Sequence, residues 1–369
     1  MSVIVKLALS MLCEHPERRT GLSTLFHGLV AQALVEFPQV HWLLFAGPNQ
    51  STCISESRVE ICRDFPANDR LMARLWADQF RVAAEARRRG AAALLTVGYY
   101  PARTAGLPVI MHVFSLHHLR QGGLRSAYRR WALNRGLRRA ALVIANSKWT
   151  ATQLPVRPAP LLVSHEGVDL DRFRPEGPKG GPAWPAEYLL WAGNFYAYKR
   201  AELALAAYAR LPAALRARFP LLMAGGDWSG GRARAEAAAV HFGVARDVRF
   251  LGWVEDAVLP ALFRGARAHL LSTAEETFGR SVLEAMACGC PNLLQDLPVL
   301  REVTGGVAQF VDFSDSAAAG AGLERLCADE AQVAQLRAAG PRRAAEFGFS
   351  RLARERVEAI LAAVGATNR

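Results

Sequence analysis

Short apolar runs alternate with helix-length segments along almost the whole chain. Val3 to Leu9, Ala92 to Val97 and Ala268 to Ser272 are examples of runs with the length of a β-strand. Strands that are apolar on both faces, separated by stretches long enough for a helix, are typical of parallel sheets covered on both sides. The pattern therefore predicts an α/β fold in both halves of the chain.

One stretch near the middle, Pro175 to Pro185, breaks this alternation and is rich in Pro, Gly and charged residues. Such a composition is typical of a linker. The 369 residues are also enough for two domains that each bury a core. We expect two Rossmann-like, doubly wound domains facing a cleft, the first at residues 1–175 and the second at residues 176–350.

The residues from Glu276 to Glu284 form the most informative polar pattern. They follow an apolar run, and apolar residues then recur at helical spacing, so a helix should start near Phe278 or Gly279. Side chains tilt towards the N-terminus of a helix, which allows both carboxylates to face one crevice. Free N–H groups at Phe278, Gly279 and Arg280 suit a diphosphate. The pattern predicts a sugar-nucleotide site, because the carboxylates can accept hydrogen bonds from sugar hydroxyls.

This arrangement, continued by Ala285, Met286 and Ala287, resembles the donor-site motif of the retaining glycosyltransferases of family 4, which have the two-domain GT-B fold. The resemblance implies that Glu276 contacts the transferred sugar and that Glu284 holds the ribose hydroxyls. It also implies that the C-terminal segment, 351–369, packs back on the first, acceptor-side domain. The second domain would bind the nucleotide sugar.

Lys199 lies after the apolar run Tyr188 to Ala192, at the place where such sheets bind ligands. It matches the Lys of the family's phosphate-binding element, whose Lys and Arg neutralise the donor diphosphate. Asn194 stands where one form of that element has Arg, so one phosphate charge lacks its usual partner. Three explanations stay open: Arg200 supplies the charge, Arg280 supplies it, or the donor is held less tightly.

Weaker fragments extend the resemblance into both domains. Gly225 ends the strand expected beside the nucleotide, and Gly21 opens a helix where the family has a glycine turn near the donor phosphates. The family's His-Asp pair is missing after Pro108 to Phe114. His117 is the preferred substitute and His112 the alternative, and a histidine without function fits either position equally well. The residues implied for donor binding are Gly21, Asn194, Lys199, Arg200, Gly225, Phe278, Gly279, Arg280, Ser281 and Glu284, with Glu276, Lys199 and His117 in catalytic roles.

The chain is strongly basic, with a formal net charge of +12 and a pI near 10.0. This charge calls for an acidic partner larger than one diphosphate. Between Arg120 and Arg139, arginines alternate with Leu, Tyr and Trp, which is typical of a helix that binds an anionic membrane surface. A buried apolar face with solvated arginines outside explains the same pattern equally well.

Other features bear on where the protein works. No apolar stretch reaches the roughly 18 to 20 residues of a membrane-spanning helix, and the N-terminus has no cleavage signal. The six cysteines have neither metal nor disulfide spacing. We expect a cytoplasmic protein that can lie peripherally on the inner face of the cell membrane.

The resemblance implies a retaining hexosyltransferase that moves a hexose from a nucleotide diphosphate sugar to a hydroxyl of a glycan or lipid-linked acceptor. GDP-mannose is the first expectation for the donor and a UDP-hexose the second. No metal or other cofactor is expected, because Asp169 and Asp171, the one Asp-x-Asp pair, fall outside the donor motif. A sugar-nucleotide epimerase of GT-B fold is the alternative. A nucleic-acid-binding protein is disfavoured, because the arginines are spread and no stacking-aromatic motif is present.

Overall fold

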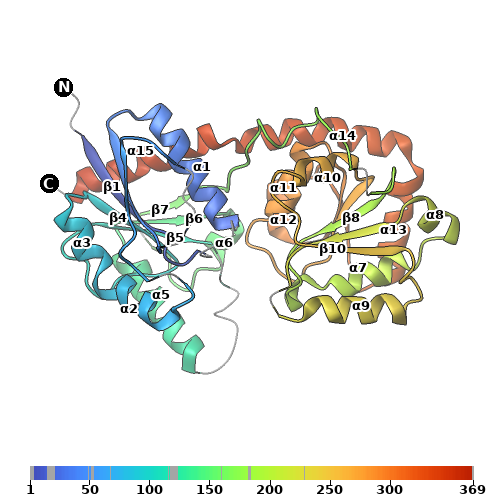
Figure 1. Ribbon diagram of the computed structural model, residues 1–369, viewed down its shortest axis with the longest axis horizontal. Helices are drawn as coiled ribbons and strands as arrows, with labels where there is room; N and C mark the ends of the chain where they lie inside the picture. Colours follow the sequence, from blue (N-terminus) through green and yellow to red (C-terminus); the bar gives the residue numbers. More distant parts are fainter. Residues whose placement is uncertain are drawn as a thin grey trace. The chain divides into compact units, whose positions relative to one another are not determined.

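The computed structural model describes residues 4–14, 21–48, 50, 54–66, 68–114, 116, 124–158, 160–181, 184–227 and 229–367. The chain forms two compact units, coloured by sequence in Figure 1. Unit 1 comprises Met1–Gly167 and Phe349–Arg369, and unit 2 comprises Val168–Gly348. The boundaries expected from the sequence lay at residues 175 and 350. Each unit has one parallel sheet with helices around it, so the predicted doubly wound α/β class is confirmed.

In the described part of unit 1, seven strands form a parallel sheet in the order β3-β2-β1-β4-β5-β6-β7. β1 is central: Leu7 pairs with Trp42 of β2 on one side and with Ala93 of β4 on the other. The strands are Val5–Ser10 (β1), Val40–Phe45 (β2), Val59–Cys62 (β3), Ala93–Val97 (β4), Val109–Val113 (β5), Leu142–Ala145 (β6) and Leu161–Val163 (β7).

Alternate side chains of β1 enter different cores, which explains why its middle, Leu7 to Leu9, is apolar throughout. Leu7 and Leu9 belong to a core with Phe26 of α1 and Val357 of α15, whereas Ala8 belongs to a core with residues of α2 and α3. Both faces of the sheet are therefore covered, as expected for parallel strands. The helices of unit 1 are Gly21–Glu36 (α1), Leu71–Phe80 (α2), Val82–Arg88 (α3), Leu124–Arg139 (α5), Lys148–Thr152 (α6) and Phe349–Thr367 (α15).

The last helix, α15, packs against α1 although the two are far apart in sequence (Figure 1). Gly28 of α1 lies under the ring of Phe349, and a Cβ at Gly28 would come within 2.5 Å of that ring. The missing side chain therefore allows the close approach of the two helices. The C-terminal segment thus contributes to the core of unit 1.

In the described part of unit 2, six parallel strands have the order β10-β9-β8-β11-β12-β13. The strands are Leu189–Ala192 (β8), Leu221–Ala224 (β9), Val248–Gly252 (β10), Ala268–Leu271 (β11), Asn292–Gln295 (β12) and Gln309–Val311 (β13). The helices are Ala197–Lys199 (η1, a 3₁₀ turn), Ala201–Tyr208 (α7), Ala213–Arg218 (α8), Gly231–His241 (α9), Leu259–Gly265 (α10), Arg280–Ala287 (α11), Pro298–Thr304 (α12), Ser316–Ala328 (α13), Glu330–Ala344 (α14) and Ala345–Phe347 (η2). The main core lies between the sheet and α7, α9 and α13, and includes the buried Trp191 and Phe313.

Candidate donor site in unit 2

The candidate donor residues lie after β8 and β11, which are neighbours in the sheet. The chain leaves β8 towards β9 and β10 on one side and returns to β11 on the other side, so the order of connection reverses between β8 and β11. Doubly wound sheets bind ligands outside the carboxyl ends of the strands at such a reversal. Lys199 follows β8 and Glu276 follows β11, so the topology brings these two residues together.

Hydrogen bonds fasten the loop after β8 to the loop after β11. Ser272 Oγ donates to the carbonyl oxygen of Lys199 at 3.2 Å, and the amide of Ala274 donates to the carbonyl oxygen of Tyr198 at 2.6 Å. Both acceptors belong to the 3₁₀ turn η1. The backbone of the two loops therefore fixes the position of Lys199.

Lys199 and Glu276 form an ion pair between Nζ and Oε1. Their side chains are only 15% and 12% exposed. Burial disfavours the charged amine, but the charge and hydrogen bond of Glu276, together with the hydroxyl of Tyr198, outweigh this effect, so the pKa of Lys199 lies above its usual value. Nζ also lies 5.4 Å from the centre of the Tyr198 ring, within the range of a cation–π contact. Lys199 is therefore charged at neutral pH.

The helix α11 begins at Arg280, just after the start expected from the sequence. Gly279 caps it with a φ of +96°, and a Cβ at Gly279 would lie 2.6 Å from Leu300 Cδ2. Glycine is the residue that tolerates this conformation and this contact. Within the described residues, the amides of Gly279 and Ser281 have no hydrogen-bond partner. They are available to an anion at the helix N-terminus.

The first turns of α11 carry a second ion pair. Arg280 Nε lies 2.9 Å from Glu284 Oε1, and the two side chains are 19% and 13% exposed. Phe278, by contrast, points into the core: its side chain is buried and meets the ring of Phe347 edge-on at 6.0 Å. Only the backbone of Phe278 is thus in a position to contact a ligand.

Arg200 has an unusual backbone conformation, with φ +48° and ψ +49° in the left-handed region. This conformation costs a residue with a side chain of order 1–3 kcal/mol and clusters at functional sites. In the described part of the chain, no carboxylate lies within ion-pair distance of Arg200, whereas Arg280 is engaged by Glu284. Of the two arginines that could replace the missing phosphate partner, Arg200 is the one without an ion pair in the described residues, although its charge also acts on Asp312.

Asn194 and Gly225 join the loops after β8 and β9. Asn194 Oδ1 accepts a hydrogen bond from the amide of Gly226 at 3.1 Å. Gly225 has a φ of +154°, and a Cβ there would lie 1.8 Å from the carbonyl oxygen of Gly193. Only glycine allows these backbones to approach so closely. Both residues thus have a structural role, and their predicted contact with the donor stays a prediction.

Two predicted residues belong to unit 1. Gly21 is the first residue of α1, and His117 lies outside the described residues. His112 is fully buried in β5, and burial keeps its pKa well below the usual value. His112 is therefore a core residue, and the roles of Gly21 and His117 stay predictions.

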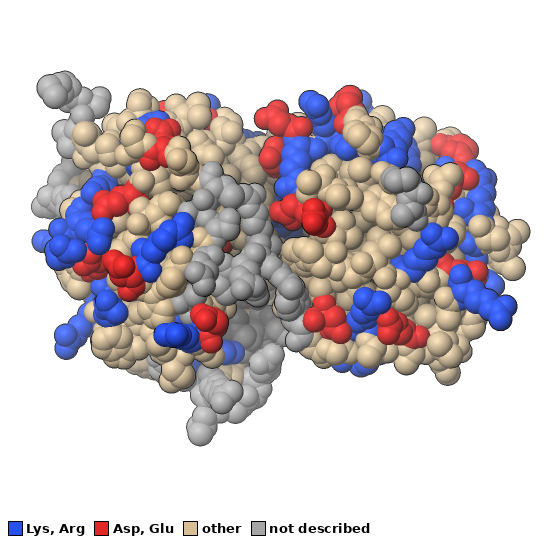
Figure 2. Space-filling model, viewed as in Figure 1, with Lys and Arg blue, Asp and Glu red and all other residues tan. Residues whose placement is uncertain are grey.

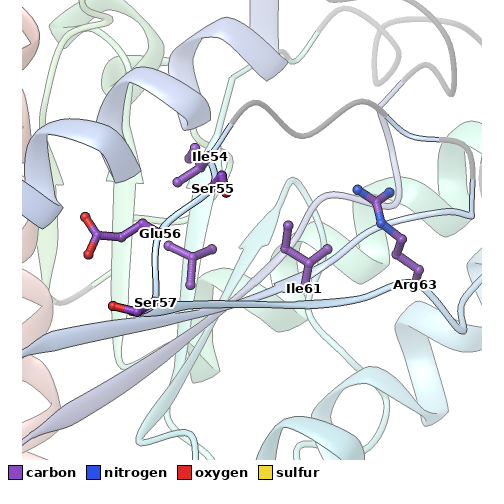
Figure 3. A pocket seen from close by; sticks show the side chains of 7 residues that line it. Ile54, Ser55, Glu56, Ser57, Ile61 and Arg63 are labelled. Carbon is purple, nitrogen blue, oxygen red and sulfur yellow. The ribbon is translucent and has the colours of Figure 1, made fainter.

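A cavity of about 490 Å³ lies beside the edge strand β3 of unit 1, where Figure 3 shows Glu56, Ile61 and Arg63 among its lining residues. Glu56 is paired with Arg58 at 3.1 Å, and Arg63 Nη1 donates to the carbonyl oxygen of Gln50 at 2.7 Å. The charged groups of this cavity thus already have partners within unit 1. Over the described ranges, no group of three or more His, Cys, Asp or Glu residues is arranged to hold a metal ion.

Sequence reasoning missed the exposed face of α2. Leu71, Met72, Leu75, Trp76 and Phe80 are all at least partly exposed, Met72 by 77% and Trp76 by 56%. Their helical spacing was visible in the sequence, but the same spacing is typical of a buried face. None of the described helices, α2 included, is long and apolar enough to cross a membrane.

Two family models match the chain. The model of Glycosyl transferases group 1 matches residues 179–343, and the model of Glycosyltransferase Family 4 matches residues 28–172. The first match covers the segments that carry Lys199, Glu276 and Glu284.

Curated relatives match parts of the chain. It is 30% identical over 178 residues to O-antigen chain mannosyltransferase B of Escherichia coli, a match that covers 48% of this chain and 46% of that protein. It is 33% identical over 197 residues to D-inositol 3-phosphate glycosyltransferase of Geodermatophilus obscurus, which covers 48% of this chain and 44% of that protein. The chain spans about half the length of the curated relatives it matches.

Solved structures resemble the chain over nearly its whole length. Sucrose-phosphate synthase from Thermosynechococcus elongatus has a TM-score of 0.80 at 20% identity, covering 98% of this chain and 100% of that one. HepE of Anabaena, solved in complex with UDP-glucose, has a TM-score of 0.73 at 17% identity, covering 97% and 99%. At such identities the likeness concerns the fold, and the GT-B fold expected from the sequence is confirmed.

Proposed function

We propose that this chain, which belongs to the family 4 glycosyltransferases of GT-B fold, is a retaining hexosyltransferase. Its reaction moves a hexose from a nucleotide diphosphate sugar to a hydroxyl of a glycan or lipid-linked acceptor. One observation carries the proposal: the pairs Lys199–Glu276 and Arg280–Glu284 lie at the reversal of the unit 2 sheet, next to the start of α11. Cations and free amides suit a diphosphate, and carboxylates suit sugar hydroxyls.

Each group has a separate task in this mechanism. The bond between the sugar C1 and the phosphate oxygen breaks, a bond from C1 to the acceptor oxygen forms on the same face, and the proton of the acceptor passes to the departing phosphate. Lys199, Arg200 and the amides of Gly279 and Ser281 stabilise the charge that develops on the diphosphate. Glu276 orients the sugar through its hydroxyls, and Glu284 holds the ribose.

Donor binding requires an exchange of partners. In the absence of a ligand, Lys199 and Glu276 neutralise each other. A sugar nucleotide supplies phosphate oxygens to Lys199 and hydroxyl donors to Glu276 in the same event. A ligand that offers only one of these groups leaves the other charge without a partner at 12–15% exposure, which is unfavourable.

The donor itself is proposed from similarity. Mannosyltransferases are among the relatives, which favours GDP-mannose, and the Anabaena neighbour holds UDP-glucose, which keeps a UDP-hexose as the second choice. Lys199 and Arg200 are the cations expected at the diphosphate, and no metal ligand set accompanies them in the described residues. A metal-independent reaction stays part of the proposal, because these cations can neutralise the diphosphate themselves.

A thermal-shift screen of nucleotide sugars tests the proposed donor. A true donor at about 100 times its dissociation constant should stabilise the fold by about 2.7 kcal/mol. The corresponding free sugar and the free nucleoside diphosphate are the matched controls and should give smaller shifts. Absence of a shift with every nucleotide sugar would contradict the donor site. Conversion of the donor to an epimer without acceptor would instead establish the epimerase alternative.

We also propose that unit 1 docks on an anionic membrane surface, where a lipid-linked acceptor would lie. The basic excess of the chain belongs to this unit: it has 25 Lys and Arg against 12 Asp and Glu, whereas unit 2 has 20 against 21. Figure 2 shows some of the basic side chains of unit 1, with acidic ones interspersed. Such an imbalance attracts anionic lipid.

Two helices of unit 1, α5 and α2, contribute different kinds of side chain to the proposed membrane contact. Leu133 and Leu137 of α5 are buried in the core with Met111, so the aliphatic face of α5 does not reach a membrane. The exposed side of α5 carries arginines and Trp131, which is 60% exposed, while α2 presents its exposed apolar face. The loop after β4 contacts both helices. The amide of Arg103 donates to the carbonyl oxygen of Gln79 in α2 at 3.1 Å. Arg135 of α5 donates to the carbonyl oxygen of residue 101, also at 3.1 Å.

Liposome co-sedimentation tests the docking proposal. Binding should require anionic lipid and weaken as salt rises, because the Debye length falls to about 8 Å at physiological ionic strength. Met72→Ser with Trp76→Ser should reduce binding without changing charge, and Val240→Ser on the exposed surface of unit 2 is the matched control. Replacement of four exposed arginines by Gln should reduce binding further: Arg129, Arg130, Arg138 and Arg139. Equal pelleting with neutral and anionic liposomes, or none with either, would contradict the proposal.

A further inference from the structure

Unit 2 contains a cavity of about 360 Å³ at the opposite end of the sheet from the donor loops. Glu187 lies two residues before β8 and Arg267 one residue before β11, whereas Lys199 and Glu276 follow the same two strands. The cavity is therefore separate from the donor site, and no task in the proposed reaction involves it.

Three cations of the lining have no acidic partner. Arg264, on α10, is only 8% exposed, and it donates to the carbonyl oxygens of Pro178 at 2.7 Å and Arg174 at 3.2 Å. Arg337 of α14 is half-buried and donates to the carbonyl oxygen of residue 266 at 2.9 Å. Lys179 lies exposed beside them. In the described part of unit 2, no carboxylate lies within ion-pair distance of any of the three.

The two other charged residues of the lining are already neutralised. Arg267 pairs with Glu330 at 2.8 Å, and Glu187 pairs with Arg218 at 2.7 Å. The same Arg218 contact, through a hydrogen bond, keeps the pKa of Glu187 below its usual value. The net charge facing the cavity is therefore set by Lys179, Arg264 and Arg337 and is positive.

This concentration of charge is unusual within unit 2, which is almost neutral as a whole. Many of its other cations pair with acids, as Arg216 does with Asp247, and Arg301 with Asp296. Burial of a guanidinium without a carboxylate is costly unless another anion compensates for its charge. Arg264 is such a group, since its hydrogen-bond acceptors are two neutral carbonyls.

We propose that this cavity binds a small phosphorylated molecule. A phosphate dianion accepts charge-assisted hydrogen bonds from Arg264 and Arg337, and Lys179 adds a third positive charge. Trp184, whose ring lies edge-on to Tyr188 at 6.4 Å, supplies an apolar wall for the rest of the molecule. A volume of about 360 Å³ is within the range of small-molecule sites.

Calorimetric titration with inorganic phosphate and with a hexose monophosphate, at constant ionic strength, tests this site. The double substitution Lys179→Gln with Arg337→Gln should weaken binding of both probes about tenfold or more, because one charge-assisted hydrogen bond and one further positive charge are lost. Arg342→Gln is the matched control, because Arg342 is exposed on the same helix as Arg337. It should leave binding unchanged.

Two further variants separate the possible sources of a signal. Lys199→Ala removes the phosphate partner of the donor site and should leave the cavity signal intact. Trp184→Ala should weaken binding of the hexose monophosphate and leave binding of inorganic phosphate unchanged, because the sugar packs on the ring. Equal affinities of the unmodified protein for the two probes would identify free phosphate as the ligand. No saturable binding to the unmodified protein would overturn the proposal. The proposal would also be overturned if Lys199→Ala abolished binding of the probes while the Lys179→Gln, Arg337→Gln double variant left it unchanged. Neither result would bear on the transferase activity.

Discussion

Replacement of Lys199 by Ala is expected to lower kcat/KM for the nucleotide sugar by about two orders of magnitude, by analogy with the loss of one oxyanion-stabilising donor. The amine is charged, only 15% exposed, and held in place by the loop after β11. A fixed cation next to a diphosphate stabilises the bound donor and, more strongly, the leaving group in the transition state. Steady-state kinetics at varied donor concentration measure the effect.

A matched variant controls for the loss of charge. Arg234→Ala removes one exposed cation from α9 of the same unit and should leave kcat/KM unchanged. If a well-folded Lys199→Ala protein keeps its donor affinity and rate, Lys199 has no phosphate role.

The ion pair allows folding and catalysis to be separated. Lys199→Ala alone leaves the carboxylate of Glu276 without a cation at 12% exposure, which should also destabilise unit 2. Adding Glu276→Gln removes that buried charge, so the double variant should regain stability in denaturant unfolding but no activity. Recovery of activity together with stability would show that the single variant had failed only by misfolding.

Glu276→Gln and Glu284→Gln are expected to have different kinetic effects, although each exchanges one carboxylate for an amide of the same shape. Glu276 is assigned to the sugar next to the reacting carbon, so its variant should mainly lower kcat and relax the choice of hexose. Glu284 is assigned to the ribose, whose contacts are similar in the ground and transition states, so its variant should mainly raise KM.

Arg280 also affects the KM expected for the Glu284→Gln variant. Glu284→Gln releases Arg280 from its 2.9 Å contact and frees a cation beside the diphosphate, which partly offsets the loss. The double variant Glu284→Gln with Arg280→Gln removes this effect and should show the full increase in KM. The same kinetic signature for Glu276→Gln and Glu284→Gln would refute the division between sugar and ribose.

The sequence was sufficient to predict that Lys199 and Glu276 each follow a strand at the ligand-binding edge of a sheet. Both follow apolar runs of strand length, and in a parallel sheet all such runs end at the same edge. The neighbouring positions of β8 and β11, which bring the two side chains within reach of each other, were not predicted. Their mutual ion pair was not predicted, because the motif was interpreted with a ligand between them, and without one the two charges are each other's nearest partners.

Other features depend on contacts that periodicity does not encode. The spacing of Leu133 and Leu137 in α5 fits a core and a membrane equally well, since both environments favour burial of the same residues. The spacing of Met72 and Trp76 in α2 also fits a core and a membrane equally well, and in α2 these side chains are exposed. The need for glycine at position 225 arises from the backbone of Gly193 in another loop, which no local pattern shows.

In the proposed reaction, the ion pair between Lys199 and Glu276 also has a consequence for product release. Once the hexose has left, the nucleoside diphosphate still occupies Lys199, but Glu276 has lost the hydroxyls that replaced its cation. The two side chains are then drawn back to each other, and the re-formed pair competes with the product for the same amine. Re-formation of this ion pair thus favours release of the nucleoside diphosphate and, with it, the next catalytic cycle.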